Sequence, residues 1–291
     1  MNQTVKEFGK RVVALIPSKL WISYRFKKKM GYAMDWKNPE TYSQKLQWLK
    51  VYDRNPLYTT LVDKYEVKKY VAEKIGEQYI IPTLGVWDEF DDIDFDSLPE
   101  QFVLKCTHDS GGLVIVKDKS KFDKEAARKL FRVALNRNPY DVSREWPYKN
   151  VKPRIIAEQY MEDEKTAELR DYKFFSFRGE PKAMFIASER ASETEETKFD
   201  FFDMDFNHLP FTNGHPNAKV LPAKPENFDE MKTLASKLSE ELPQSRIDFY
   251  EVNGKTYFGE ITFFHWGGTK PFEPTGWDYT FGSWIKLPEI K

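Results

Sequence analysis

The stretch RIDFYEVNGKTYFGEITFF (residues 246–264) predicts the fold of the C-terminal part of the chain. Apolar and polar residues alternate on both sides of Asn253-Gly254, a dipeptide that strongly favours the turn of a β-hairpin. Asp248 and Glu260 lie on the two arms, so the alternation can place both carboxylates at one end of a two-stranded ribbon. Carboxylates among so many apolar residues are costly to bury unless a cation compensates them.

Two kinds of cation can provide that compensation. Magnesium prefers oxygen ligands and is often bound by carboxylates together with nucleotide phosphates. Arg246, on the same strand as Asp248, offers an ion pair that needs no metal. Taken alone, the hairpin favours neither a metal site nor a plain salt bridge.

A second hairpin is predicted for FVLKCTHDSGGLVIV (residues 102–116), where two strand-forming runs flank a glycine-containing loop. Lys105 on the first run supplies the compact positive charge that suits a phosphate. Backbone N–H groups of the loop can approach an anion closely because glycine has no Cβ, and the residues concerned are Ser110, Gly111 and Gly112. Such a loop is more often a simple turn, and it lacks the Lys-Ser or Lys-Thr pair of a Walker P-loop.

The strand predicted for RIIAEQYM (residues 154–161) carries a candidate nucleoside site near its end. Glu158, Tyr160 and Met161 suit a nucleoside through backbone amides, an apolar contact and a ribose hydroxyl. An ordinary surface glutamate fits the same pattern.

The following strand begins with Asp171 and carries Lys173 two residues later. If this strand alternates, Lys173 points the same way as Phe175 and Phe177. We therefore expect an inward-facing lysine that needs an anionic partner.

Motifs of other enzyme classes are missing from the sequence. Ser110 has no G-x-S-x-G setting, so a hydrolase nucleophile is not expected. His108 and His265 are candidate acid–base groups near neutral pH. No metal-ligand spacing connects the histidines, which argues against zinc; they are His108, His208, His215 and His265.

Composition indicates a globular protein of 291 residues with 40% hydrophobic and 31% charged side chains, enough for a core divided into two or three lobes. Lys and Arg (45) nearly balance Asp and Glu (46), so no overall field favours nucleic acid. The single Cys106 excludes an internal disulfide framework, and neither a bilayer-spanning run nor a secretory signal is apparent. These features predict a cytoplasmic protein.

Helices are predicted at residues 63–76, 124–135 and 228–242, and a further hairpin at 172–188. The acid-rich residues 88–100 are predicted to form a solvated linker, and residues 78–87 a short buried strand broken by Pro82. Helices and strands mix without regular strand–helix–strand alternation, which indicates an α+β fold.

The first thirty residues hold eight Lys or Arg and one acid, Glu7, around a short apolar stripe. We expect a solvated basic helix that packs on the body by its apolar side. Peripheral binding to an anionic membrane is the alternative. The stripe consists of Val5, Phe8, Val12, Val13 and Ile16.

Taken in order, these pieces resemble the ATP-grasp superfamily, and from about residue 25 onwards the chain is similar to the TupA-like ATP-grasp family. Three segments carry this resemblance: residues 38–76, RDYKFFSFRGEPK (170–182) and YFGEITFF (257–264). The resemblance implies a nucleotide held between two α+β lobes, after an N-terminal helical lobe. The implied segments are an N-terminal basic, aromatic-rich lobe (1–60), a helix-and-strand segment (61–97), a small lobe with the glycine loop (98–165) and a C-terminal lobe with the metal-binding hairpin (166–291).

The same resemblance assigns roles to the candidate residues, with ATP and Mg²⁺ as ligands. Asp248 and Glu260 would bind magnesium, while Thr262 stands where the family usually has Asn and would be a weak ligand. Arg246 would face the transferred phosphate. The implied nucleotide contacts are Lys105, Ser110, Gly111 and Gly112 at the phosphates, Glu158, Tyr160 and Met161 at the adenine, and Asp171 and Lys173 at a phosphate or elsewhere on the nucleotide.

The implied activity is ligation, in which ATP converts a carboxylate to an acyl phosphate that an amine then captures. The family also implies bacterial capsule or cell-surface polysaccharide synthesis, with an amino acid joined to a uronic acid or an acidic peptide extended. A lipid-linked glycan at the inner membrane face is a further expected partner. A glycosyltransferase and a non-catalytic nucleotide-binding protein are the alternatives.

Overall fold

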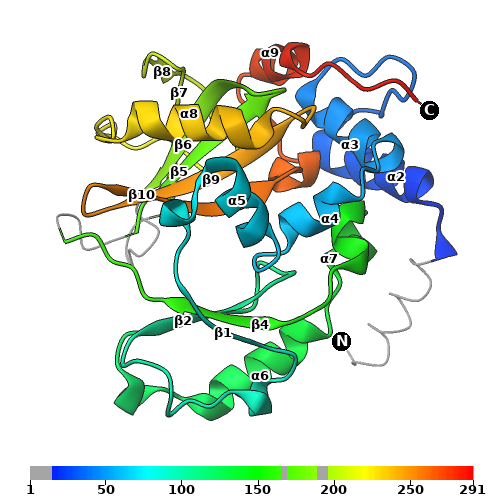
Figure 1. The fold of residues 1–291 in the computed structure, drawn as a ribbon. Coiled ribbons are helices and arrows are strands. Elements are labelled where there is room, and N and C mark those ends of the chain that lie inside the picture. The colour runs from blue at the N-terminus through cyan, green and yellow to red at the C-terminus, as the bar shows by residue number, and fades with distance from the viewer. Residues whose placement is uncertain (1–14, 165–168, 189–195, 291) are drawn as a thin grey trace.

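The computed structural model describes residues 15–164, 169–188 and 196–290, whose strands form two antiparallel sheets (Figure 1). The four-stranded sheet has the order β1-β4-β2-β3 and the six-stranded sheet the order β10-β9-β5-β6-β7-β8. The strands are β1 (Thr83–Trp87), β2 (Phe102–Cys106), β3 (Leu113–Val116), β4 (Ile155–Gln159), β5 (Asp171–Phe177), β6 (Glu180–Ser188), β7 (Lys198–Phe202), β8 (His208–Leu209), β9 (Ser245–Val252) and β10 (Lys255–Thr262).

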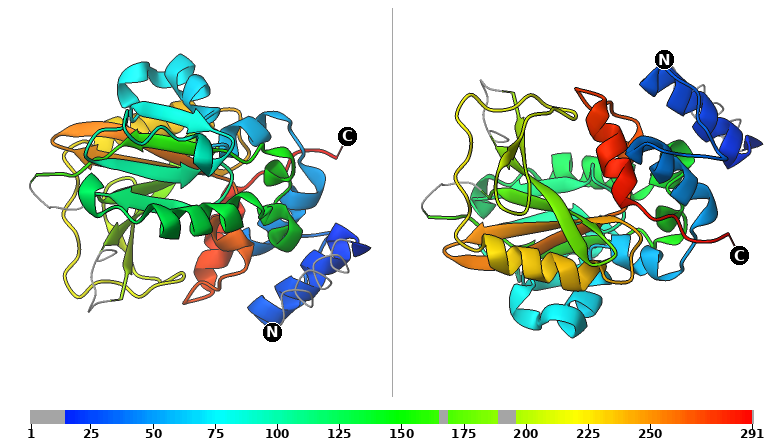
Figure 2. Two further views of the ribbon diagram at one scale, coloured as in Figure 1. Left: turned by 90° about the horizontal axis from the view of Figure 1, so that it is seen from below. Right: turned by 90° about the horizontal axis from the view of Figure 1, so that it is seen from above.

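Helices cover both sheets and form most of the N-terminal region (Figures 1 and 2). The α-helices are α2 (Ser18–Met30), α3 (Tyr42–Tyr52), α4 (Leu57–Val62), α5 (Val67–Ile75), α6 (Lys124–Leu135), α7 (Pro139–Ser143), α8 (Phe228–Ser239) and α9 (Gly276–Trp284). The 3-10 helices are η1 (Glu77–Tyr79), η2 (Phe90–Asp92), η3 (Lys119–Lys121), η4 (Trp146–Asn150) and η5 (His265–Gly268).

The four-stranded sheet packs against α6, which lies below it in Figure 1. The prediction of a solvated linker at residues 88–100 is wrong, because the apolar residues between its acids are buried in the core of this sheet. Those residues are Phe90, Ile93, Phe95 and Leu98. The predicted buried strand at residues 78–87 is also only partly correct, since β1 starts after Pro82 and is a half-exposed edge strand.

The six-stranded sheet carries the larger core, which is rich in phenylalanine. One face packs against α8, whose contacts reach β5, β6 and β9. Helix α9 adds Phe281, which contacts the ring of Phe175 edge-on, and it also packs against α3. The mixed helices and antiparallel sheets confirm the α+β prediction.

Helices of the N-terminal region begin and end at local sequence signals. Helix α3 begins with a capping box in which the Thr41 hydroxyl accepts from the Gln44 backbone and the Gln44 side chain accepts from the Thr41 backbone. Helix α5 ends at Gly76 as predicted, with φ of 116°. Four of the five residues of the apolar stripe predicted to pack on the body lie in residues 1–14, outside the described residues, whereas five of the eight basic residues of that segment lie on α2.

The hairpin of β9 and β10 turns at Asn253-Gly254 as predicted, with positive φ angles of 51° and 75° that suit a two-residue hairpin turn. Its pairing shifts between Phe258 and Glu260, so Gly259 forms a bulge. A Cβ on Gly259 would lie 3.1 Å from the backbone oxygen of Asp248.

The predicted domain boundaries at residues 60, 97 and 165 stay predictions. No helix in the described part of the chain has both the length and the apolar character to cross a bilayer.

Candidate active site

The bulge at Gly259 brings the polar residues of the β9–β10 hairpin onto one face. It pairs Glu260 directly with Asp248, and Thr262 with Arg246. In an unbroken two-residue hairpin, Gly259 would oppose Asp248, and Glu260 would point to the other face of the sheet. The register of this hairpin therefore creates the cluster.

Asp248 lies at the centre of the cluster and is fully buried. Its Oδ1 accepts from Arg246 Nε and its Oδ2 from Arg246 Nη2, both at 2.7 Å. Lys173, which pairs with Asp248 across β5 and β9, contacts the same Oδ2. Both carboxylate oxygens are thus bonded to cations, as expected for a charge this deep in the protein.

Lys173 has the anionic surroundings that its inward position requires. Its ammonium contacts Asp248 and lies 3.0 Å from Asp171 Oδ1. Burial lowers the pKa of Lys173, although Asp248 opposes this shift. Asp171 and Lys173 therefore join the hairpin residues in one cluster.

Glu260 differs from Asp248 because its side chain is 40% exposed. Its Oε1 accepts from Arg246 Nη2 at 3.0 Å and from the Thr262 hydroxyl at 3.1 Å. Burial by itself would raise the pKa of Glu260, but nearby cations outweigh it and lower that pKa to about 2; they are Lys64, Lys173 and Arg246. Glu260 is therefore ionised and faces the open side of the cluster.

Arg246 is held from behind by a buried hydrogen-bond chain. Its Nη1 lies 2.8 Å from Nδ1 of His265, and Nε2 of His265 lies 3.0 Å from Oδ1 of Asn213. A guanidinium only donates, so Nδ1 accepts and the proton of this imidazole is on Nε2. The Asn213 amide nitrogen is fixed by the backbone oxygens of Lys270 and Pro271.

His265 is consequently a neutral link in this chain rather than a free acid or base. Burial, with added repulsion from Arg246 and Lys173, holds the pKa of His265 well below its usual value. Both of its ring nitrogens are already hydrogen-bonded. The other candidate, His108, is also buried, and its Nε2 lies 3.0 Å from the Arg137 backbone oxygen.

Magnesium fits this cluster only in part. Among the described residues, no group of three or more His, Cys, Asp or Glu side chains is arranged to hold a metal ion. Both carboxylate oxygens of Asp248 are already bonded to Arg246 or Lys173. The Thr262 hydroxyl forms hydrogen bonds with Arg246 and Glu260. Glu260 has the exposure and charge of a ligand, and one carboxylate suffices where nucleotide phosphates supply other oxygens.

A second charged cluster lies on the four-stranded sheet. Glu158 is nearly buried, and its Oε2 lies 2.7 Å from Lys105 Nζ while its Oε1 lies 2.5 Å from Lys68 Nζ. Burial raises the pKa of Glu158, but the two lysines outweigh it and hold the pKa below its usual value. The structure thus brings Glu158 and Lys105 together, and Lys68 is an additional residue.

Gly112 has a packing role that the sequence did not indicate. A Cβ there would lie 2.4 Å from the Cys106 sulfur and 3.0 Å from Cβ of Ala134. Its backbone oxygen accepts from the Cys106 backbone at 2.7 Å. Gly112 is therefore needed for close packing, whatever Ser110 and Gly111 do at the exposed tip of the loop.

Tyr160 and Met161 follow directly after β4, at the point where the chain leaves the four-stranded sheet. The Lys117 ammonium lies 5.4 Å from the centre of the Tyr160 ring. A little further on, the Asp163 carboxylate accepts from the backbone of Asn253 at 2.8 Å. This segment therefore contacts the turn of the β9–β10 hairpin.

Lys64 links the glycine loop to the cluster around Glu260. Its ammonium donates to the backbone oxygen of Asp109, in the glycine loop, at 3.0 Å. The same charge is the strongest of the cations that lower the pKa of Glu260. Lys64 and Lys68 were not predicted, although both lie at the start of the helix predicted at residues 63–76, four residues apart and therefore on one face of it, which was a usable signal. Asn213 had no such signal.

The family model described as TupA-like ATPgrasp matches residues 44–286, and no match to a curated protein was found. Among solved structures, the chain is similar to L-amino acid ligase from Bacillus licheniformis (TM-score 0.46, 14% identity, 76% of this chain and 48% of that chain covered). It is also similar to D-alanine–D-alanine ligase from Bacillus anthracis complexed with ATP (TM-score 0.42, 16% identity, 70% and 55% covered).

A D-alanine–D-alanine ligase from Helicobacter pylori is covered more fully (TM-score 0.43, 15% identity, 86% and 70%). The chain spans about half the length of the two Bacillus structures. The match to the family model covers most of the length of this chain. The chain therefore belongs to the TupA-like ATP-grasp family.

Proposed function

We propose that the chain is an ATP- and magnesium-dependent ligase that activates a carboxylate as an acyl phosphate and joins it to an amine. The observation that carries this proposal is the cluster on β5, β9 and β10, where a partly exposed Glu260 lies beside the tightly held Arg246. Family membership supports ATP as the phosphate donor. The carboxylate and the amine are inferred only as classes.

The residues of the chain would divide the work between the two sheets. Lys105, 24% exposed, can turn from Glu158 towards the phosphates of ATP, and Lys64 holds the glycine loop through the Asp109 backbone oxygen. Glu260, with Asp248 behind it, would hold magnesium, which neutralises phosphate charge when bound. Arg246 cannot swing freely, because Asp248 and His265 fix it on two sides.

Two balanced steps make up the reaction. A carboxylate oxygen of the substrate attacks the γ-phosphorus, and the bond to the bridging oxygen breaks to release ADP. The amine nitrogen then attacks the acyl carbon, inorganic phosphate leaves, and the nitrogen loses a proton. Arg246 offers positive charge where phosphoryl oxygens accumulate negative charge, and catalysis rests mainly on positioning and charge neutralisation.

The family resemblance also supports a role in bacterial surface polysaccharide synthesis. We propose a uronic acid or an acidic peptide as the carboxylate substrate, and a lipid-linked glycan as the carrier of that substrate. The protein would work in the cytoplasm, with its basic N-terminal residues at the inner membrane face. Co-sedimentation with anionic liposomes at low salt tests that last point, and no binding would contradict it.

Product analysis tests the proposed reaction. The protein is incubated with ATP, magnesium and a panel of uronic acids and amino acids, and the products are identified by mass spectrometry. We expect ADP, phosphate and an amide, and a hydroxamate when hydroxylamine replaces the amine. ATP binding without turnover over the whole panel, or thermal stabilisation by a UDP-sugar instead of ATP, would contradict the proposal.

A further inference from the structure

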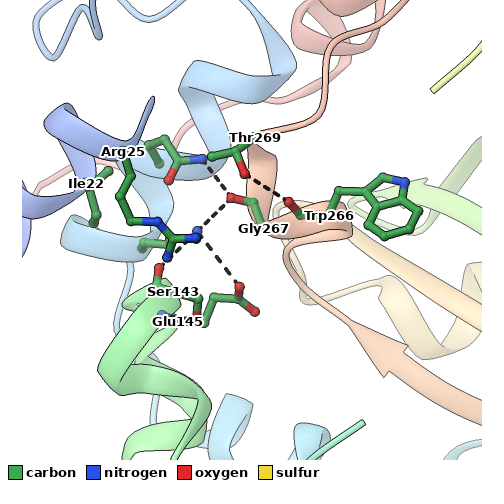
Figure 3. Close-up of a pocket in the computed structure, with 9 residues that line it drawn as sticks. Ile22, Arg25, Ser143, Glu145, Trp266, Gly267 and Thr269 are labelled. Atoms are coloured by element: carbon green, nitrogen blue, oxygen red, sulfur yellow. Dashed lines mark hydrogen bonds and ion pairs between the residues drawn. The ribbon is translucent and has the colours of Figure 1, made fainter. Parts of the chain in front are cut away.

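A separate pocket of about 180 Å³ lies where α2 and α3 meet α7 and η5 (Figure 3). Helices α2 and α3 contribute Ile22, Arg25, Gln47 and Lys50. The other lining residues come from α7, η5 and the residues just after them, and they are Ser143, Glu145, Trp266, Gly267 and Thr269. At about 30 Å³ per water molecule, the space equals roughly six waters, which suits a small molecule. None of these residues was a predicted site residue.

Lys50 is the most constrained charge in this pocket. Its side chain is 2% exposed, and its ammonium donates to the backbone oxygens of Gly267 at 2.8 Å and Ser143 at 3.2 Å. Burial lowers the pKa of Lys50 to about 8, although Glu145 opposes this shift. Because its ammonium donates two hydrogen bonds to the residues that the structure describes, Lys50 can donate a third to a ligand.

Glu145 lies close to Lys50 but forms only a long ion pair with it. The distance between Lys50 Nζ and Glu145 Oε1 is 3.9 Å, beyond hydrogen-bond range. Burial raises the pKa of Glu145, with Lys50 opposing it. Within the described part of the chain, this carboxylate therefore has no cationic partner as close as Arg246 is to Asp248.

Arg25 adds a second cation from α2. Figure 3 shows Arg25 and Glu145 extending into the same space beside Gly267, while the indole of Trp266 points away. The guanidinium donates to the Val142 backbone oxygen through Nη1. Among the described residues this guanidinium forms no other hydrogen bond, so its remaining N–H groups can bind a bidentate partner such as a carboxylate.

The pocket adjoins the main cluster through η5. The carbonyl oxygen of Gly267, whose φ is 61°, accepts a hydrogen bond from Lys50. Gly267 lies two residues after His265, and the His265 ring is hydrogen-bonded to Arg246. A Cβ on Gly267 would lie 3.3 Å from Glu145 Oε1. A ligand in this pocket would therefore lie beside Gly267, which is two residues from His265, the side chain that holds Arg246.

The charges on the walls match a zwitterion better than a simple anion. Arg25 and Lys50 can bind a carboxylate, and Glu145 can bind an ammonium group. A phosphate dianion would meet Glu145 at close range, and like charges in a desolvated pocket repel strongly. The apolar wall formed by Ile22 suits a small aliphatic part.

We propose that this pocket binds a free amino acid, the amine-bearing substrate of the proposed ligase, with its carboxylate at Arg25 and Lys50 and its ammonium at Glu145. This inference rests on the proposed function for the role of the ligand, but not for the binding itself. It specifies that the amine substrate also carries a free carboxylate, so that the molecule is a zwitterion.

Calorimetric titration of the full chain without ATP tests this proposal. The probes are the twenty L-amino acids with D-alanine and D-glutamate, and then the N-acetyl and carboxamide derivatives of those that bind. We expect at least one free amino acid to bind and both blocked derivatives to bind at least ~10-fold more weakly, about 1.4 kcal/mol. Absence of binding across the panel, or equal binding of blocked forms, or tighter binding of inorganic phosphate, would overturn it.

Two variants assign each end of the ligand. Arg25→Gln should remove the preference for the free amino acid over its carboxamide derivative. Glu145→Gln should remove the preference for the free amino acid over its N-acetyl derivative. Lys28→Gln, on the exposed side of α2, is the matched control and should change neither. Unchanged preferences in both pocket variants would refute the site.

The thermal stability of each variant shows that it is folded. Because the titration contains no ATP, amino acid binding without ligase turnover would refute only the proposed function. Ligase turnover without amino acid binding would refute only this pocket.

Discussion

Two charged clusters of the molecule differ in how many carboxylates and cations form their direct ion pairs, and we infer different roles from this difference. On the six-stranded sheet, two cations face three carboxylates, namely Arg246 and Lys173 against Asp171, Asp248 and Glu260. On the four-stranded sheet, two lysines share one carboxylate, namely Lys68 and Lys105 with Glu158. Counted by direct ion pairs, the first cluster has one more carboxylate than cation, and Lys64 adds a further positive charge near Glu260. The second cluster has one more cation than carboxylate. We infer that the first cluster suits a bound cation and the second a phosphate.

The comparison also shows that burial decides which charges can act on a ligand. Asp248 and Glu260 face each other across one ladder, yet Asp248 is buried with both oxygens bonded and Glu260 is partly exposed. We infer that Asp248 mainly holds Arg246 in place and that Glu260 contacts the ligand. Removing each carboxylate should therefore have a different consequence.

The largest expected effect is on stability, from Asp248→Asn. This substitution removes one partner of a buried ion pair and leaves Arg246 and Lys173 without their shared anion. We expect the free energy of unfolding to fall by about 3–5 kcal/mol, measured by urea denaturation. A loss below about 1 kcal/mol would show that Asp248 does not hold the cluster together.

The next effect is on nucleotide affinity, from Lys105→Met. Loss of a charge-assisted contact to phosphate should cost about 1.5–3 kcal/mol, roughly a 10- to 150-fold weaker Kd for ATP by calorimetry. Lys121→Met is the matched control, because Lys121 is exposed and pairs with Asp118. Equal ATP affinity in both variants would remove Lys105 from the site.

Gly112→Ala sharpens the comparison within the glycine loop. The added methyl would overlap Cys106, so we expect a loss of about 1–3 kcal/mol in the free energy of unfolding. Gly111→Ala is the control, since its Cβ would meet only the side-chain ends of Arg137 and Asp109, at 3.1 and 3.2 Å. Similar costs for both would mean that packing against Cys106 is not the reason for Gly112.

The smallest expected effect is a pH dependence from Glu158. Its folded pKa lies below the ordinary 4.5, so its contribution to stability is present above pH 4.5 and is lost as the pH falls through the folded value. The stability advantage of the wild type over Glu158→Gln should therefore shrink below pH 4.5. An advantage that grows in acid, measured by denaturation at several pH values, would contradict the ion pairs with Lys68 and Lys105.

Local patterns were sufficient to predict much of this structure. The turn at Asn253-Gly254, the helix that ends at Gly76 and the inward-facing Lys173 all follow from rules that involve neighbouring residues. The order of these pieces also carried the family resemblance, which the family model confirms. Turn chemistry and strand alternation are encoded within a few residues.

The parts that sequence reasoning missed depend on contacts between distant segments. The bulge at Gly259 sets the pairing of Asp248 with Glu260, although strict alternation alone would separate them. Asn213 reaches His265 across 52 residues of sequence. The acid-rich residues 88–100 concealed four core residues, because charge content outweighed their apolar spacing in our prediction.

The most direct test of the central claim is Glu260→Gln, with substrate-stimulated ADP release and urea denaturation measured on the same sample. Because Glu260 is 40% exposed, we expect unfolding free energy to change by less than about 1 kcal/mol, while ADP release falls at least ~100-fold. Glu180→Gln, an exposed glutamate paired with Lys182, should retain both properties. Full ADP release by Glu260→Gln would contradict the assignment of this cluster as the active site.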